Sequence, residues 1–220
     1  MCFSPEASFA AAAAIGAAGA AALAQKPERR ALPLACIPLI FALHQAIEGG
    51  VWLGIEADGA APVFGSTLFL IVAFVVWPLY APAAALAAET EDSRRRAMAA
   101  CLAVGVLIAT YLGIMMVVSP YETTIRGGCL SYQNGVDYPL AAELLYGVAT
   151  TLPFLLASRP WILGFGAAVL GGLALTREAY AQAAISVWCF FAALASVVLL
   201  VHFVRERRLR RTLAGPKPAP

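Results

Sequence analysis

Long apolar runs alternate with short polar connections along nearly the whole chain. Seven runs can be separated in this way, and most have about the 20 residues that cross a bilayer as a helix. The pattern predicts an all-α integral membrane protein, a seven-transmembrane helix bundle that forms a single domain over residues 1–210. The predicted helices occupy residues 5–24, 32–54, 63–87, 97–118, 139–157, 160–176 and 183–204. Residues 211–220 are expected to be a disordered cytoplasmic tail.

Composition supports the same class of protein. Of the 220 residues, 61% are hydrophobic and only 13% are charged, whereas soluble domains carry about 25% charged residues. The basic residues flank the apolar runs in short clusters, so a lipid bilayer is the expected partner and nucleic-acid binding is not expected. We therefore expect a multi-pass membrane protein.

The distribution of basic residues predicts the orientation of the bundle. With seven helices, 13 of the 15 lysines and arginines fall on one side, and only Arg126 and Arg177 fall on the other. Because basic residues concentrate in cytoplasmic connections, the carboxy terminus is expected in the cytoplasm and the amino terminus outside. The glycines and alanines of residues 5–24 predict close packing against another helix or a second copy of the chain, so a homo-oligomer is one expectation.

Three polar side chains, His44, Gln45 and Glu48, interrupt the second apolar run. Ionisable groups inside a membrane helix are costly, and they are functional-site candidates for that reason. His44, Glu48 and Trp52 recur every four residues and therefore share one helix face. The predicted orientation puts this face in the outer half of the bundle.

Other predicted helices contribute polar residues at a similar depth. Glu143 is expected level with Glu48, and Tyr146 follows Glu143 on the same face. Two carboxylates at one depth could share a proton, pair with Arg177 or His44 as the cation, or bind a divalent metal. The His-x-x-x-Glu spacing, which zinc sites also use, makes His44, Glu48 and Glu143 the candidate metal ligands. The expected ligand-binding pocket is lined by His44, Gln45, Glu48, Trp52, Glu143, Tyr146, Arg177 and Ser186.

Two large cofactors are disfavoured. The lysines, Lys26 and Lys217, lie outside the predicted helices, so a retinal Schiff base is not expected. The histidines, His44 and His202, lie at opposite depths, which argues against a haem held by two histidines.

The longest connection, residues 119–138, is predicted to lie outside. Asn134-Gly135 is a turn signal, so a small hairpin over the mouth of the bundle is expected here. Cys2 and Cys129 are both predicted on this oxidising side, which makes them candidates for a disulfide. The alternative is two unrelated thiols, since spacing alone does not establish a bridge.

The motifs Met1-Cys2-Phe3-Ser4 and His44-Gln45, followed by Glu48-Gly49 and Trp52, resemble an uncharacterised bacterial family of multi-pass membrane proteins. The resemblance implies a location in the bacterial cytoplasmic (inner) membrane. A more distant resemblance is to the seven-helix superfamily of alkaline ceramidases and related hydrolases. Those enzymes hold zinc with three histidines, an aspartate and a serine. Here only His44 corresponds to that set, because His202 stands alone on the last predicted helix.

Three functions are compatible with these features. The preferred one is a sensor, transport or accessory protein whose outer pocket binds a small polar ligand, a proton or a metal ion. The second is a membrane-embedded, metal-dependent hydrolase of a lipid-like substrate, with Glu48 or Glu143 as the general base. The third is a structural membrane subunit whose polar side chains only hold its helices together.

Overall fold

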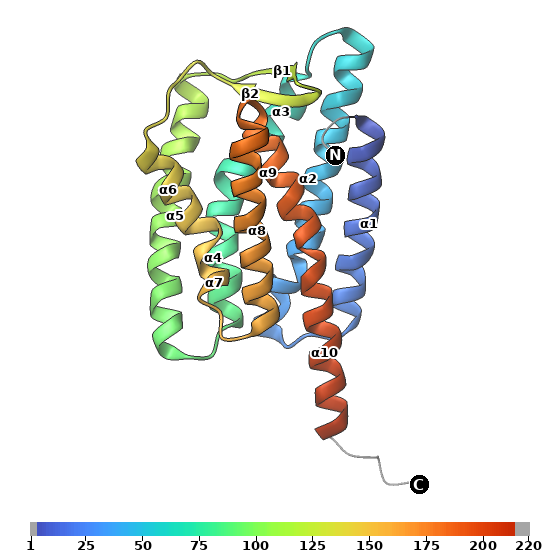
Figure 1. The fold of residues 1–220 in the computed structure, drawn as a ribbon, viewed down its shortest axis with the longest axis vertical. Helices are drawn as coiled ribbons and strands as arrows, with labels where there is room; N and C mark the ends of the chain where they lie inside the picture. Colours follow the sequence, from blue (N-terminus) through green and yellow to red (C-terminus); the bar gives the residue numbers. More distant parts are fainter. Residues whose placement is uncertain (1–3, 214–220) are drawn as a thin grey trace.

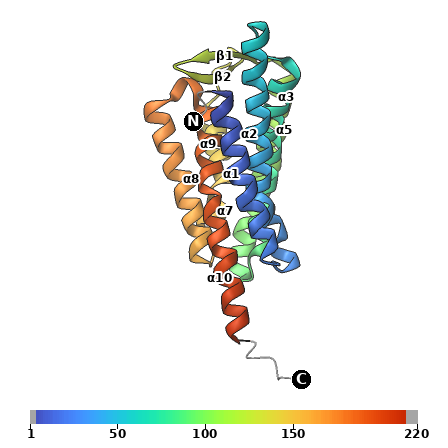
Figure 2. The same cartoon turned by 90° about the vertical axis from the view of Figure 1, so that its right-hand side faces the viewer.

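A computed structural model describes residues 4–213 as helices that run from one end of a bundle to the other (Figures 1 and 2). A short β-hairpin lies across one end, which we call the hairpin end. The opposite end, from which the last helix projects, we call the basic end. The α-helices are α1 (Pro5–Ala24), α2 (Leu32–Asp58), α3 (Val63–Ile71), α4 (Trp77–Ala88), α5 (Asp92–Val118), α6 (Leu140–Thr150), α7 (Leu152–Leu155), α8 (Pro160–Ala179), α9 (Ala184–Ala195) and α10 (Val197–Leu213).

Six helical segments of the described residues are long and apolar enough to cross a membrane. They are Pro5–Ala24, Arg29–Asp58, Val63–Ala88, Asp92–Val118, Pro160–Ala179 and Ala181–Leu213. This agrees with the prediction of a helical membrane bundle. The remaining predicted helix, the fifth in chain order at residues 139–157, is instead the short pair α6 and α7, broken at Thr151 ahead of Pro153. Proline lacks the N–H that a continuing helix would use. A seventh crossing therefore stays a prediction.

The ends of the helices lie further out than the apolar runs indicate. α5 begins at Asp92 rather than at residue 97, and α2 continues to Asp58 rather than ending at residue 54. α10 continues to Leu213, so residues 211–213 of the predicted tail are helical; residues 214–220 lie outside the described residues. Polar side chains can continue a helix beyond the membrane, and hydrophobicity alone does not mark such extensions.

α1 packs closely against α2, as its small residues predict. Ser4 caps α1 by accepting a hydrogen bond from the Ala7 N–H at 3.3 Å. A Cβ added at Gly19 would lie 2.7 Å from a side-chain carbon of Leu39, so only glycine fits at this crossing. The absence of side-chain bulk lets the two backbones approach each other.

A π-helical turn, η2 (Val72–Val76), joins α3 to α4. Pro78 has no N–H, and the Trp77 N–H bonds to the Val72 carbonyl five residues back. The Ala73 carbonyl, which a regular helix would bond to Trp77, accepts a hydrogen bond from the Tyr146 hydroxyl at 2.6 Å. In the five-residue pattern of the π-turn, the donor to the Ala73 carbonyl would be residue 78, which is a proline without an N–H. The Ala73 oxygen is therefore free to accept from Tyr146, and this bond connects α6 to the π-turn.

The connection between α5 and α6 forms the expected hairpin, with a different turn. Strands β1 (Glu122–Arg126) and β2 (Cys129–Gln133) are antiparallel. The turn is Gly127-Gly128, where both residues have positive φ (58° and 77°), while the predicted turn Asn134-Gly135 follows β2. Cys129 is buried. Because Cys2 lies outside the described residues, the pairing of Cys2 with Cys129 stays a prediction.

At the basic end, one carboxylate, Glu89 between α4 and α5, bonds to two connections. Its Oε1 accepts from the Thr90 and Glu91 N–H groups and from the Ser158 hydroxyl, and its Oε2 accepts from the Ser158 N–H at 2.8 Å. Arg94 extends the same contact by donating to the Leu156 carbonyl at 2.7 Å. The α4–α5 and α7–α8 connections are therefore fixed to each other.

Candidate functional site

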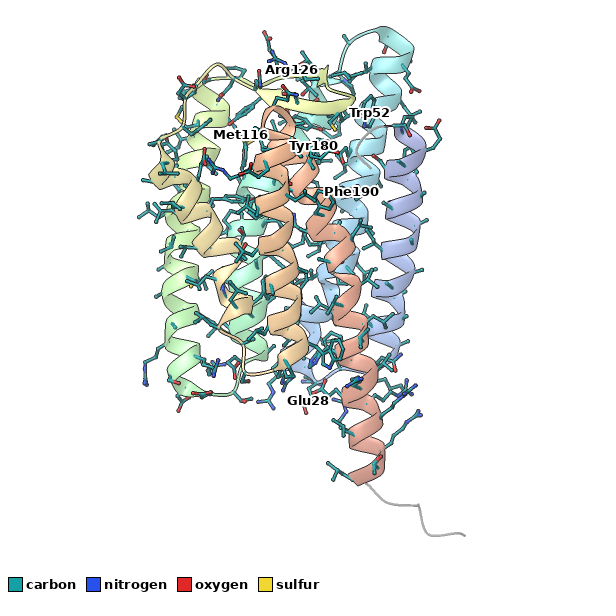
Figure 3. The ribbon with its side chains drawn as sticks, in the orientation of Figure 1. Glu28, Trp52, Met116, Arg126, Tyr180 and Phe190 are labelled. Atoms are coloured by element: carbon teal, nitrogen blue, oxygen red, sulfur yellow. The ribbon has the colours of Figure 1, made fainter. Side chains whose placement is uncertain are left out.

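Trp52 lies in the half of the bundle nearer the hairpin (Figure 3), and Glu48 precedes it by one helical turn on α2. Its carboxyl group is completely buried (0% exposed). The Ser186 hydroxyl on α9 donates a hydrogen bond to Glu48 Oε1, and the Gln45 side-chain amide donates to Oε2 at 3.3 Å. Within the described part of the chain, no ion pair involves Glu48. This carboxyl group thus joins α2 to α9 through hydrogen bonds without an opposite charge.

His44 is equally buried but has a different set of contacts. Its Nε2 donates to the Phe69 carbonyl at 3.0 Å, and its Nδ1 accepts from the Trp77 indole N–H at 3.4 Å. The ring also stacks on Phe69, with centroids 4.1 Å apart. Both ring nitrogens are therefore satisfied by α3 and α4. The arrangement matches a neutral histidine that fixes helix packing, with its proton on Nε2.

Three buried polar atoms near this level have no hydrogen-bond partner among residues 4–213. They are Gln45 Oε1, Trp52 Nε1 and Ser8 Oγ. α1 reaches this level of α2, since a Cβ at Gly49 would meet the Phe9 ring at 2.9 Å. Buried polar groups are normally paired, so this half of the bundle retains capacity to bind a proton donor or acceptor such as water.

Glu143 belongs to a different part of the molecule. Its carboxylate is about half exposed, with a side-chain exposure of 47%, and it pairs with Arg177 at the end of α8. Pairing with a cation was one of the three alternatives for this residue, and it separates Glu143 from the buried contacts of Glu48. Among the described residues, no group of three or more His, Cys, Asp or Glu side chains could hold a metal ion.

Tyr146 lines a small cavity of about 30 Å³. Its ring meets Trp188 edge to face at 5.4 Å. The other walls are mainly apolar, namely Ile37, Phe41, Trp77, Ala81, Thr150, Phe154, Phe165, Val169, Trp188, Cys189 and Ala192. The residues expected to line one pocket thus lie in different places: Gln45, Glu48 and Ser186 form a buried hydrogen-bonded group, and Tyr146 lines this mainly apolar cavity.

The sequence pattern located α2 as one wall of the site but missed most of its partners. Trp77 was not among the residues expected at the site, yet its indole N–H donates a hydrogen bond to His44. The Phe69 carbonyl could not be found from residue type, since any residue offers a carbonyl. Ser186 was matched to Glu48 by depth, and the hydrogen bond between them is the contact on which the site depends.

Comparison with known proteins gives a family whose function is unknown. A family model described as a family of unknown function (DUF6629) matches residues 1–214. No curated protein and no solved structure is similar to the chain.

Proposed function

We propose that this chain, which belongs to DUF6629, a family of unknown function, is a multi-pass membrane protein that binds a proton at Glu48. The proton would act on helix packing and give the protein a sensor, transport or accessory role. The observation that carries this proposal is the buried carboxyl group, which accepts hydrogen bonds from α2 and α9 and has no cationic partner in the described chain.

The proposed arrangement has seven crossings, with the amino terminus outside and the carboxy terminus in the cytoplasm of a bacterium. Six helical segments are long enough to cross, and α6 with α7 runs in the same general direction between the two ends of the bundle (Figure 1). The connections with the most basic residues share one end, which would be cytoplasmic. The hairpin would then lie on the outer surface, above Glu48.

The burial of Glu48 favours a proton over a larger ligand. An ionised carboxylate without a counter-charge is very costly in an apolar interior, and such a group is neutralised instead. A proton neutralises Glu48 and needs no additional volume, whereas any larger ligand would require the helices to separate. In the carboxylic acid one of the two contacts would reverse direction: the acid O–H would donate to Ser186 Oγ, or to Gln45 Oε1 once the Gln45 amide turns over, while the other carboxyl oxygen would still accept a hydrogen bond.

Loss of that proton would act directly on the contact between α2 and α9. A bare carboxylate at this position needs water or a cation, and the enclosed site offers neither among the described residues. We expect deprotonation to open the hairpin-end half of the bundle. The unpartnered atoms Gln45 Oε1, Trp52 Nε1 and Ser8 Oγ would then bind the entering water.

Tryptophan fluorescence tests this coupling, because Trp52 lies on α2 and Trp188 on α9. The wild-type protein in detergent micelles is expected to show a reversible pH-dependent change in fluorescence. Glu48→Gln, which cannot ionise, should abolish the change. Glu143→Gln removes an exposed carboxylate and should leave it intact. If Glu48→Gln responds to pH as the wild type does, Glu48 only holds helices together.

A further inference from the structure

α10 projects beyond the basic end of the bundle and carries five arginines (Figures 1 and 2). Two of them point back toward the end of α1. Arg207 donates to the Ala24 carbonyl at 2.9 Å, and Arg210 donates to the Lys26 carbonyl at 3.4 Å. The last carbonyls of a helix lack helical donors, so these two arginines are accounted for by the fold.

The other three arginines, Arg205, Arg208 and Arg211, have no hydrogen-bond acceptor or ion-pair partner within residues 4–213, and all three are exposed. The Arg205 guanidinium lies over the ring of Trp161 at the start of α8, 4.7 Å from its centroid. Tryptophan with arginine is typical of the boundary between lipid tails and head groups. This pair therefore marks the membrane surface at the basic end.

An exposed apolar stripe leads to these arginines along the same face. Leu194, Val197 and Val201 are 45%, 38% and 38% exposed. They precede Arg205 and Arg208 at spacings of three and four residues, which place all five on one side of the α9–α10 rod. The stripe would contact lipid tails, and the two guanidinium groups would lie where a head group begins.

We propose that this face binds an anionic phospholipid of the cytoplasmic leaflet. Its phosphate would bind between Arg205 and Arg208, next to Trp161, and an acyl chain would follow the stripe. Guanidinium groups suit phosphate because they donate two parallel hydrogen bonds. Glu206, the nearest acid on α10, does not oppose this, since it faces Arg159 at 3.4 Å and Arg210 at 3.7 Å. The proposal is independent of proton binding at Glu48.

Native mass spectrometry of the full chain tests this site, with phosphatidylglycerol and phosphatidylcholine supplied in equal amounts. The wild type should retain phosphatidylglycerol preferentially. The double variant Arg205→Gln/Arg208→Gln should reduce this preference about tenfold, since each arginine near a charged membrane surface contributes substantially. The control Arg29→Gln/Arg30→Gln removes the same charge from the same end and should keep the preference within about twofold.

The single variant Arg208→Gln guards against misfolding, because Arg208 makes no side-chain contact that the described fold depends on. It should lose part of the preference while its helix content and thermal unfolding match the wild type. Equal losses in both double variants would overturn the proposal in favour of general charge attraction. Displacement of the lipid by equimolar glycerol phosphate would overturn it in favour of a soluble phosphate ligand.

Discussion

Ser186 on α9 donates a buried hydrogen bond to Glu48 on α2, although 138 residues separate the two in the chain. With the Gln45 amide on the other carboxyl oxygen, Glu48 is held from two helices at once. The site is therefore both a packing contact and a proton-binding group, and substitutions at Glu48 can distinguish these roles.

Glu48→Gln should preserve stability, and Glu48→Ala should not. In this variant the side-chain oxygen at position 48 can accept from the Ser186 hydroxyl. If the Gln45 amide turns over, the new NH₂ group can donate to Gln45 Oε1, which has no partner among residues 4–213. Alanine leaves a cavity and two unpaired groups, which should lower the free energy of unfolding by about 2–4 kcal/mol. Unfolding in mixed micelles measures both variants. Equal losses would contradict a neutral carboxyl group at this position.

Gly105→Ala should strongly destabilise the contact between α4 and α5. A Cβ at Gly105 would lie 2.0 Å from the Pro78 carbonyl oxygen, which is backbone and cannot move independently. That oxygen faces α5 because Pro82, four residues later, has no N–H to offer it. We expect a loss of about 3 kcal/mol in the free energy of unfolding.

The matched control is Gly113→Ala on the same helix, where the nearest atom to the new Cβ would be a Val75 methyl group at 3.7 Å. This ordinary contact should leave stability unchanged or raise it by up to about 1 kcal/mol, because alanine favours helices over glycine. If both substitutions have the same effect, α4 and α5 do not cross at Gly105.

Acid should lower the free energy of unfolding by protonating the Glu89 carboxylate. Burial of this carboxyl group raises its pKa, but hydrogen bonds from the N–H groups of Ser158, Glu91 and Thr90 and from the Ser158 hydroxyl outweigh burial and lower the pKa from 4.5 to about 2. A group with a lowered pKa stabilises the folded state above its ordinary value. This contribution is lost as pH falls from about 4.5 toward about 2.

Thermal unfolding between these pH values measures the effect. Glu89→Gln should be less stable than the wild type near neutral pH, and its stability should change less across the acid range. Glu28→Gln removes an exposed carboxylate paired with Arg30 and should retain the wild-type acid dependence. An unchanged acid profile in Glu89→Gln would show that the two connections at the basic end do not depend on this carboxylate.

The apolar runs predicted most of the bundle because the backbone N–H and C=O groups of a membrane helix must pair with one another within one continuous apolar segment. They could not predict that residues 139–157 divide at Thr151, since apolar composition continues through the break. They also could not predict the π-helical turn before Pro78, where Ala73 bonds to Tyr146 through a contact between distant segments.

For the candidate site, matching of depth was informative, whereas matching of face agreed with the structure on α2 but not at Glu143 on α6. Depth followed from topology, and it associated Glu48 with Ser186 correctly. Whether Glu143 turns inward depends on the rotation of α6, which its sequence does not encode. Its pairing with Arg177 at the surface shows that a carboxylate at the right level can still face away.

Infrared difference spectroscopy of the carboxyl group at position 48 tests the central claim most directly. The wild-type protein near neutral pH should show the C=O stretch of a protonated, hydrogen-bonded carboxylic acid. This band should disappear as the pH is raised, over the same pH range in which the tryptophan fluorescence changes. It should be missing from Glu48→Gln, whereas Glu143→Gln should retain it. An ionised Glu48 throughout the pH range in which the bundle stays folded would contradict a proton-binding function.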